Sequence, residues 1–430
     1  MSGSPGKLTQ AMQAPDLRGR ISWLFIGFAI YALVVHIPIP GVNRAAWQQA
    51  FQAGQLFQLM GMFTGGALSK LSIAAMGITP YINASIIMQL LTVVFPYLKD
   101  LQKEGGEHGR RKLSQWTRQL AMVLAVIQGV IMVSTIKRAV TAQIFESNSL
   151  FYYAMVVATL VGGTAFLMWL GEVMSEKGIG NGVSLLIFGG IVMSYPTYVH
   201  NTFVASAAQN AYISLAAFFG VAILLVASIV AMTLAMRKVP VQYPKRQVGR
   251  KIYGGQSSFI PIRVNNAGVI SLIFAISIMF LPVTLAGILP APYGPEIKAW
   301  LDLHFNERTI LYNLAYMALI LFFTYFYSAI TFNTEDLADN LKKAGGFIPG
   351  IRPGKATADY LDKIMSRLNL IAGVFLALLA VVPTYVVQLT GVTSFYLGAT
   401  SLLIIVGVAL DTMQQVESRL VMRNYQGFMK

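Results

Sequence analysis

Long apolar windows separated by polar segments run along almost the whole chain. A helix needs about 20 mainly apolar residues to cross a bilayer. Windows of about this length lie at roughly 20–38, 72–95, 117–136, 152–171, 182–199, 212–236, 267–289, 309–332, 367–389 and 393–412. The pattern predicts an all-α integral membrane protein with ten transmembrane helices.

The second window is preceded by an interrupted apolar stretch. A short apolar run breaks at Thr64-Gly65-Gly66 and restarts at Leu68, and we expect a full helix from about 72 to 95, with Pro80 near its start. Irregular backbone at membrane depth is tolerated only inside protein or beside a water-filled cavity. The stretch 57–100 therefore predicts a pore or a binding site at its border.

Composition agrees with the apolar windows. The chain of 430 residues is 56% hydrophobic and 11% charged, whereas soluble domains carry about 25% charged residues. It contains no cysteine, so neither a disulfide framework nor thiol chemistry is expected. Residues 1–19 are polar and basic, which predicts a cytosolic N-terminal segment rather than a cleaved signal peptide.

The basic residues predict the orientation of the helices. If the N-terminus lies in the cytosol, most of the 32 Lys and Arg residues fall on the cytosolic side. The outer side keeps Arg44, Lys70, Lys137, Arg138, Lys298 and Arg308. Cytosolic loops carry an excess of Lys and Arg, so both termini, including the tail 413–430, are expected in the cytosol. The net charge of +15 then marks one face and does not indicate free nucleic-acid binding.

Ten windows divide into two halves of five, 20–199 and 212–412, joined by an outer hinge loop at 200–211. An odd number of spans in each half would place the second half upside down in the membrane. Inverted repeats of this kind commonly meet at a central pathway. The repeat follows from counting alone, since the halves show no convincing sequence identity.

Two cytosolic loops are long, which usually indicates function. The loop 237–266 alternates Val, Tyr and Ile around prolines and contains a Gly254-Gly255 turn, which predicts a β-ribbon that stands out of the membrane. The loop 333–366 has a helical pattern at each end and Gly and Pro residues at its centre.

Several classes of function lack their chemistry. No window carries a Lys, Arg, Asp or Glu at its middle, and Glu172 and Asp411 lie at cytosolic ends. Coupled transporters generally need buried ionisable residues. The chain also has no HExxH, GxxxxGK[ST] or GxSxG motif, and its four histidines are scattered. We therefore expect no catalytic residue, no metal site and no cofactor.

One face of the second window mixes apolar and polar residues. Ile78, Ile82, Ser85 and Gln89 are spaced as i, i+4, i+7 and i+11, which places them on one side of a helix. The face could meet water or a partner. Hydrogen bonding between neighbouring helices is the alternative that periodicity alone favours.

Ordered motifs along nearly the whole chain carry a family resemblance. They are IPIPG (37–41), MFTGGALSKLSI (62–73), GITPYINASIIMQLL (77–91), EGGEHGRRKLSQWTR (104–118), FLMWLGEVMSEKGIGNGVSLLIFGGI (166–191), YPKRQVGRK (243–251), NNAGVI (265–270), ADNLKKAGGFIPGIRPGKATADYLDKI (338–364) and FYLGATSLLIIVGVALD (395–411). Together they resemble the SecY family, the pore subunits of the bacterial protein-conducting channel. Gly106-Glu107-His108 and parts of the outer loops depart from the family pattern.

The resemblance implies two inverted five-helix halves around a central hourglass pore, closed by a ring of aliphatic side chains. The positions that match this ring are Ile78, Ile82, Ile187, Ile273 and Ile404. For the last three, composition alone would favour an ordinary core or lipid-facing isoleucine. Branched aliphatic side chains can close a pore by dewetting and offer no fixed hydrogen bonds to a passing chain.

The resemblance also implies a plug, a re-entrant half-helix within 57–70. The matching residues are Met60, Gly61, Met62, Phe63, Thr64, Gly65, Gly66, Ala67 and Leu68. The alternative is an interfacial re-entrant segment without a gating role. Gly65 and Gly66 are expected to act as a joint between the plug and the second helix.

Two further regions follow from the resemblance. A lateral gate between the second and seventh spans has as polar candidates Asn83, Ser85, Gln89, Thr92 and Ser277. Docking of the SecA motor and the ribosome is assigned to Lys245, Arg246, Arg250, Lys251 and Arg352. Basic side chains suit both rRNA phosphates and acidic protein patches, although charges of this kind also fix topology.

The resemblance as a whole implies a passive channel in the bacterial plasma (inner) membrane, not an enzyme. It would pass unfolded, signal-sequence-bearing polypeptides across the membrane and release hydrophobic segments sideways into membrane lipid. Energy would come from the SecA ATPase or the translating ribosome, and the expected subunits are SecE, SecG and a second copy of the chain. A small-solute secondary transporter with inverted repeats and a membrane scaffold without a conduit are the alternatives.

Overall fold

The computed structural model describes residues 15–53, 61, 64–103, 106–139, 144, 149–208, 212–243, 246–248, 251–253, 257–289, 293–306, 309–390 and 399–427. Every predicted apolar window overlaps a helix. These helices are α2 (Pro15–His36), α5 (Thr79–Val94), α7 (Gly106–Ala139), α8 (Leu150–Lys177), α9 (Gly182–Ala208), α10 (Tyr212–Leu234), α11 (Ile270–Ile288), α13 (Ile310–Thr331), α15 (Lys355–Thr390) and α16 (Ala399–Gly427).

Within the described residues, seven helices are long and apolar enough to cross a membrane. The number rises to eight if α5 and α6 (Pro96–Lys103) form one broken span, bent by 106°. Phe95, between these two helices, has extended backbone angles, as expected for a residue that precedes proline. The chain is therefore a mostly helical membrane protein. Over its described stretch Ile270–Met279, α11 is a shorter apolar helix.

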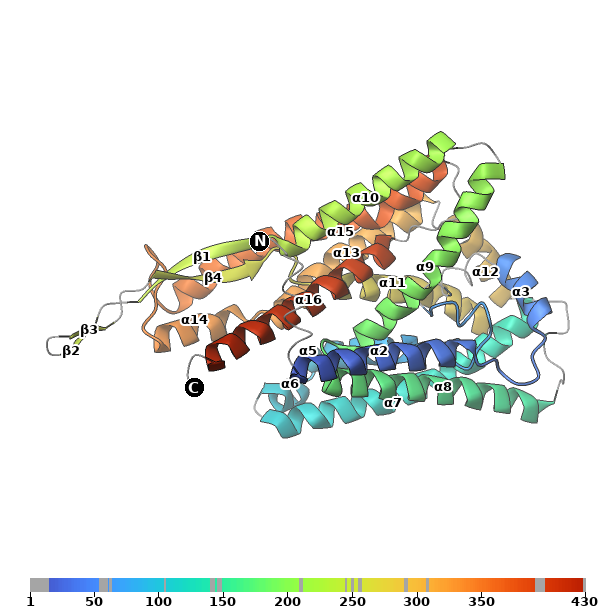
Figure 1. Cartoon of the computed structure of the whole chain (residues 1–430), viewed down its shortest axis with the longest axis horizontal. Helices are drawn as coiled ribbons and strands as arrows, with labels where there is room; N and C mark the ends of the chain where they lie inside the picture. Colours follow the sequence, from blue (N-terminus) through green and yellow to red (C-terminus); the bar gives the residue numbers. More distant parts are fainter. Residues whose placement is uncertain are drawn as a thin grey trace.

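Helix contacts follow the order of the chain. In the first half α5 packs on α7, α7 on α8, and α8 on both α2 and α9; in the second half α13 packs on α11 and α15. Helix α16 contacts α10, α15 and α9, so it joins the second half to the first. Figure 1 shows α9 running obliquely between the group that contains α10, α13, α15 and α16 and the group that contains α2, α7 and α8.

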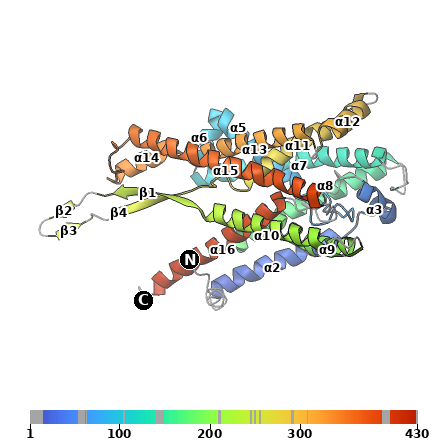
Figure 2. The same cartoon turned by 90° about the horizontal axis from the view of Figure 1, so that it is seen from above.

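The two ends of the molecule differ in structure. The β-strands and α14 (Thr334–Lys343) lie at one end, and the short helices α3 (Arg44–Ala53) and α12 (Tyr293–His304) lie toward the other (Figures 1 and 2). The first end carries both of the predicted long cytosolic loops, and the second carries predicted outer segments.

The predicted β-ribbon is confirmed. Strand β1 (Met236–Gln242) pairs antiparallel with β4 (Ser257–Arg263), and β2 (Arg246–Val248) pairs with β3 (Lys251–Tyr253). Because Val248 is opposite Lys251, the chain reverses between these residues. Gly254-Gly255, predicted as a turn, lie outside the described residues, between β3 and β4, so the turn there stays a prediction.

The second predicted loop also has the expected form, with α14 at its start and the beginning of α15 at its end. It packs against the ribbon: Gln242 and Phe347 form a bridge, and Val239, Val241 and Ile262 share a hydrophobic cluster with Leu341 and Leu361. Alternate residues of β1 are buried, as expected for a strand with one covered face. The two loops thus form one unit.

Two predicted boundaries are wrong. Helix α5 begins at Thr79, not near residue 72, because residues 64–78 form hydrogen-bonded turns. Residues 200–208, predicted as part of a hinge loop, continue helix α9 to Ala208. Residues 209–211, the rest of that loop, lie outside the described residues. Polar residues end an apolar window but need not end a helix. Thr202, for example, stays within α9 and donates its hydroxyl hydrogen bond to the carbonyl of Tyr198.

Candidate pore, plug and gate

The five isoleucines predicted as a ring lie in one hydrophobic cluster. Ile78, Ile187 and Ile404 are buried, and Ile82 and Ile273 are half-buried against them. They come from four helices in both halves of the chain: Ile78 caps α5, Ile82 lies one turn into it, and the others belong to α9, α11 and α16. The structure therefore brings together side chains up to 326 residues apart in sequence, as the numbers of Ile78 and Ile404 show.

The same cluster contains residues that sequence reasoning did not select. Val408 and Val269 belong to it, as do Ala67 and Ala74 of the turn segment 64–78. Val408 lies one helical turn after Ile404, so the i, i+4 spacing on α16 was a signal that could have found it. The two alanines had no such signal, because they approach through turns.

Most of the described plug candidates are not helical. Gly61 is helical, whereas residues 64–68 lie in turns, so the half-helix prediction is wrong for them. Met60, Met62 and Phe63 lie outside the described residues. Gly65 and Gly66 have φ of 64° and 78°, a left-handed conformation that L-residues other than glycine avoid. Two such residues in succession end a right-handed helix.

The turn segment 64–78 is held by buried hydrogen bonds. The Tyr31 hydroxyl donates to the Thr64 carbonyl (3.2 Å), and Trp47 Nε1 donates to the Leu68 carbonyl (2.7 Å). The Leu68 amide donates to Thr64 Oγ1 (3.2 Å), and the Ile39 amide donates to the Leu71 carbonyl (3.1 Å). Ala67 and Leu68 are almost completely buried. Helices α2 and α3 therefore fix this segment against the central cluster.

Gly65 lies directly against α9. A Cβ atom placed on Gly65 would come within 2.8 Å of Gly190 Cα and 3.2 Å of the Tyr31 hydroxyl. No side chain fits there unless the two backbones separate. The joint predicted at Gly65 and Gly66 is thus, in this conformation, a close contact between the turn segment and the first half of α9.

A second link lies at the exposed side of the turn segment. Lys70 Nζ is 2.6 Å from His36 Nε2, and His36 Nδ1 is 2.7 Å from the Ala32 carbonyl. If Nδ1 carries the proton for that carbonyl, Nε2 is free to accept from Lys70. Partial burial lowers the pKa of Lys70 from its ordinary value.

The predicted lateral-gate residues line α5 and α11, which are in contact. Gln89 Nε2 donates to Ser85 Oγ (3.4 Å), and Thr92 Oγ1 donates to the Gln89 carbonyl (2.7 Å). Asn83 Oδ1 and Gln89 Oε1 are buried without a hydrogen-bond partner. Ser277 is half-buried on α11.

Apolar residues complete the seam between α5 and α11. Ile86 of α5 shares a hydrophobic cluster with Phe274, Ala275 and Met279 of α11. A buried polar atom without a partner costs about 1–3 kcal/mol. The contact between α5 and α11 is therefore ordinary apolar packing at these positions, and the two amide oxygens without a partner lie on the same helix as Ile86.

The described docking candidates lie at the end of the molecule that carries the ribbon. Arg246 begins β2 and Lys251 begins β3, whereas Lys245 and Arg250 lie outside the described residues. Arg352 is exposed in the turn between α14 and α15. This turn passes through Gly350 and Gly354, which have φ of 81° and 101°.

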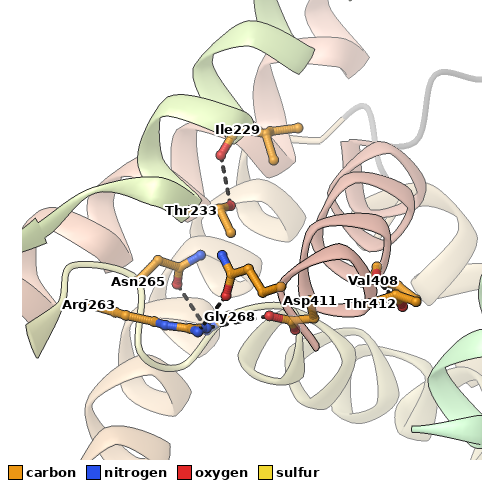
Figure 3. Close-up of polar contacts among 9 residues, drawn as sticks. Ile229, Thr233, Arg263, Asn265, Gly268, Val408, Asp411 and Thr412 are labelled. Carbon is orange, nitrogen blue, oxygen red and sulfur yellow. Dashed lines mark hydrogen bonds and ion pairs between the residues drawn. The ribbon is translucent and has the colours of Figure 1, made fainter. Parts of the chain in front are cut away.

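A polar junction joins the ribbon to the helices below it. Arg263, the last residue of β4, has Nη1 3.4 Å from Asp411 Oδ1, and its Nη2 donates to Gln414 Oε1 at 2.7 Å. Asn265 Oδ1 accepts from the Gly268 amide (3.0 Å). Figure 3 shows Arg263 pointing from the base of the ribbon toward Asp411 on α16. No group of three or more His, Asp or Glu residues that could hold a metal ion occurs in the described part of the chain.

The family profile described as SecY matches residues 72–413 of this chain. The chain is 41% identical to the protein translocase subunit SecY of Streptomyces galbus, over 98% of this chain and 99% of that protein. The chain belongs to the SecY family. Its SecY relative in Thermotoga maritima is 39% identical, over 98% of this chain and 96% of that protein. Family membership makes the chain a channel subunit of the protein translocase and not an enzyme.

Solved structures agree on the fold. A structure described as that of a protein conducting channel aligns with a TM-score of 0.66 at 18% identity, and covers 94% of this chain and 93% of that one. Sec61 in a canine ribosome-channel complex from the endoplasmic reticulum aligns with a TM-score of 0.63 at 16% identity, over 94% of this chain and 93% of that one. At these identities the likeness concerns the fold alone.

Proposed function

We propose that this SecY-family subunit passes unfolded polypeptides through the cluster formed by Ile78, Ile82, Ile187, Ile273 and Ile404. The observation that carries the proposal is the convergence of these five side chains from both halves of the chain. Aliphatic side chains exclude water and ions from a narrow constriction. They make no hydrogen bond that would have to break as each new residue passes, so a chain of any sequence could move through.

The turn segment 64–78 acts as the plug of the closed channel. Its contribution of Ala67 and Ala74 to the central cluster supports this role, as do its buried hydrogen bonds to α2 and α3. Those bonds are few, so the segment can leave as one body when a polypeptide enters. The half-helix that the family resemblance implies does not extend over residues 64–68, which lie in turns.

Hydrophobic segments leave sideways between α5 and α11. The partnerless oxygens of Asn83 and Gln89 support this assignment, because opening the seam to water or to a polar substrate backbone offers them hydrogen bonds. The cost of separating the apolar contacts around Ile86 is offset in part by that gain. A fully apolar seam would have no such compensation.

The ribbon and the α14–α15 turn dock the partners that supply energy, namely the ribosome and the SecA motor. The exposed Arg352 and the basic residues of the ribbon support this role, and a structural relative is solved within a ribosome-channel complex. We assign SecE and SecG as small membrane subunits, a second copy of the chain as a further partner, and the bacterial inner membrane as the location, with both termini in the cytosol.

Reconstitution tests the proposal. Proteoliposomes that contain this chain, its small membrane subunits and an active SecA motor should protect a signal-bearing precursor from protease in the presence of ATP. A SecA variant without ATPase activity is the control. Absence of ATP-dependent protection would contradict a polypeptide channel, and gradient-driven uptake of a small solute by the chain alone would favour the secondary transporter.

A further inference from the structure

The junction between the ribbon and α16 lies on a continuous path to the central cluster. On α16, Ile404, Gly407, Asp411 and Gln414 are spaced as i, i+3, i+7 and i+10, so they form one stripe along the helix. Asp411 and Gln414, at one end of this stripe, contact Arg263 of β4. Ile404, at the other end, is buried in the central cluster.

The chain that follows β4 runs beside the same stripe. A Cβ atom on Gly407 would meet Val269 Cγ2 at 2.9 Å, so Val269 already fills the space beside this glycine. Val269 belongs to the central cluster, and its carbonyl accepts the first helical hydrogen bond from Ile273. Two of the five cluster isoleucines, Ile273 and Ile404, therefore lie directly beyond the base of the ribbon.

The segment between Arg263 and Val269 is braced locally. Asn265 is buried, and its side chain accepts from the Gly268 amide. The Val264 amide donates to the carbonyl of Ala235 at the start of the ribbon. A braced segment with contacts at both ends transmits a displacement, whereas a loose loop would absorb it.

We propose that Arg263 is a positioning residue that couples the ribbon to the central cluster through α16. Its guanidinium holds Asp411 and Gln414 on consecutive turns, so movement of the ribbon shifts α16 and with it Ile404. The consequence for translocation rests on the proposed function, in which partners push or pull on the ribbon. The mechanical link between the ribbon and α16 does not depend on the proposed function.

Spin labels test the link without any partner. The chain has no cysteine, so Ser258→Cys on β4 and Ser418→Cys on α16 give unique sites, both exposed. Double electron–electron resonance on the reconstituted chain should give a narrow distance distribution, which Arg263→Gln broadens. The control is Lys238→Gln on β1. Lys238 Nζ lies over the Phe259 ring of the ribbon (4.9 Å), so this substitution removes a charge that interacts within the ribbon. Equal distributions in all three proteins would overturn the proposal.

Measuring precursor transport together with motor binding distinguishes a coupling role of Arg263 from a docking role. In proteoliposomes with SecA, Arg263→Gln should slow precursor transport about two- to five-fold, the range that an exposed ion pair supports, while motor binding stays equal to that of Lys238→Gln. The reversed pair Arg263→Asp with Asp411→Arg should recover most of the rate. A loss that follows motor binding, or no recovery in the reversed pair, would show that Arg263 is only a docking charge. If the unmodified chain transports nothing, the proposed function fails, and the spin-label result still decides the link.

Discussion

Replacing Gly65 by alanine should displace the turn segment 64–78, the proposed plug, from its closed position. Gly65 has φ of 64°, and a left-handed conformation costs an L-residue with a side chain about 1–2 kcal/mol. The new Cβ would also lie 2.8 Å from Gly190 Cα. Since backbone atoms are on both sides of this contact, relief requires the segment to move away from α9, and overpacking of this kind costs about 1–3 kcal/mol.

The sum of the two terms, about 2–5 kcal/mol, weakens the seated state relative to the unseated one by roughly 30-fold to several thousand-fold, since each 1.4 kcal/mol is a factor of ten. Gly66→Ala is a matched control. Gly66 has φ of 78°, so the backbone cost is similar, but its Cβ would meet only Ser69 Oγ at an ordinary 3.5 Å.

Single-channel recording in planar bilayers measures the difference. Without a motor or a precursor, Gly65→Ala should open spontaneously at least about fivefold more often than Gly66→Ala, because the contact term alone is about 1–3 kcal/mol and 1 kcal/mol is a factor of about five. Equal open probabilities for Gly65→Ala, Gly66→Ala and the unmodified channel would refute the reasoning that the contact with α9 seats the segment.

Two other substitutions test the anchor and the gate. Trp47→Phe removes one of two donors to the Leu68 carbonyl, which still accepts from the Leu71 amide (3.1 Å). The loss of one hydrogen bond costs about 0.5–1.5 kcal/mol, and the leak of ions through proteoliposomes without a precursor should rise accordingly. Gln89→Leu removes the buried, partnerless Oε1 and should stabilise the closed seam between α5 and α11. It should then slow precursors with weakly hydrophobic signal sequences more than those with strongly hydrophobic ones, measured as initial rates of protease protection.

Controls for these two variants come from neighbouring positions. Phe51 packs against the Trp47 ring (6.1 Å between centroids) but makes no hydrogen bond to the segment, so Phe51→Leu should leak less than Trp47→Phe; the reverse order would contradict the anchor. Val93→Leu on exposed α5 surface should leave both classes of precursor unchanged. A uniform slowing of all precursors by Gln89→Leu would indicate a general loss of stability instead.

The helices could be predicted from the apolar windows because lipid leaves a spanning backbone no other hydrogen-bond partners. Their ends could not. Helix α5 starts at Thr79 since Leu71 and Gly77 adopt positive φ (43° and 58°), and an apolar composition does not distinguish turns packed inside protein from helix. The continuation of helix α9 beyond residue 199 was missed because hydropathy reports the surroundings of a segment and not its backbone conformation.

The candidate site was predictable only in part. Ile78 and Ile82 share a helical face, so periodicity related them to each other. Ile187, Ile273 and Ile404 sit on three other helices, and their meeting depends on long-range packing that single-sequence patterns do not encode. The family resemblance supplied that step. The contact of Arg263 with Asp411 had no signal of either kind, since both residues resemble ordinary charges at the cytosolic ends of spans.

Disulfide crosslinking of an arrested precursor tests most directly whether the polypeptide passes through the central cluster. Ile404→Cys places the only cysteine of the chain in the cluster, and Leu370→Cys places it on exposed surface of α15. A precursor halted partway and carrying one cysteine should form a disulfide with the variant at 404 and not with the variant at 370. Crosslinking at 370 but not at 404 would contradict the proposed path.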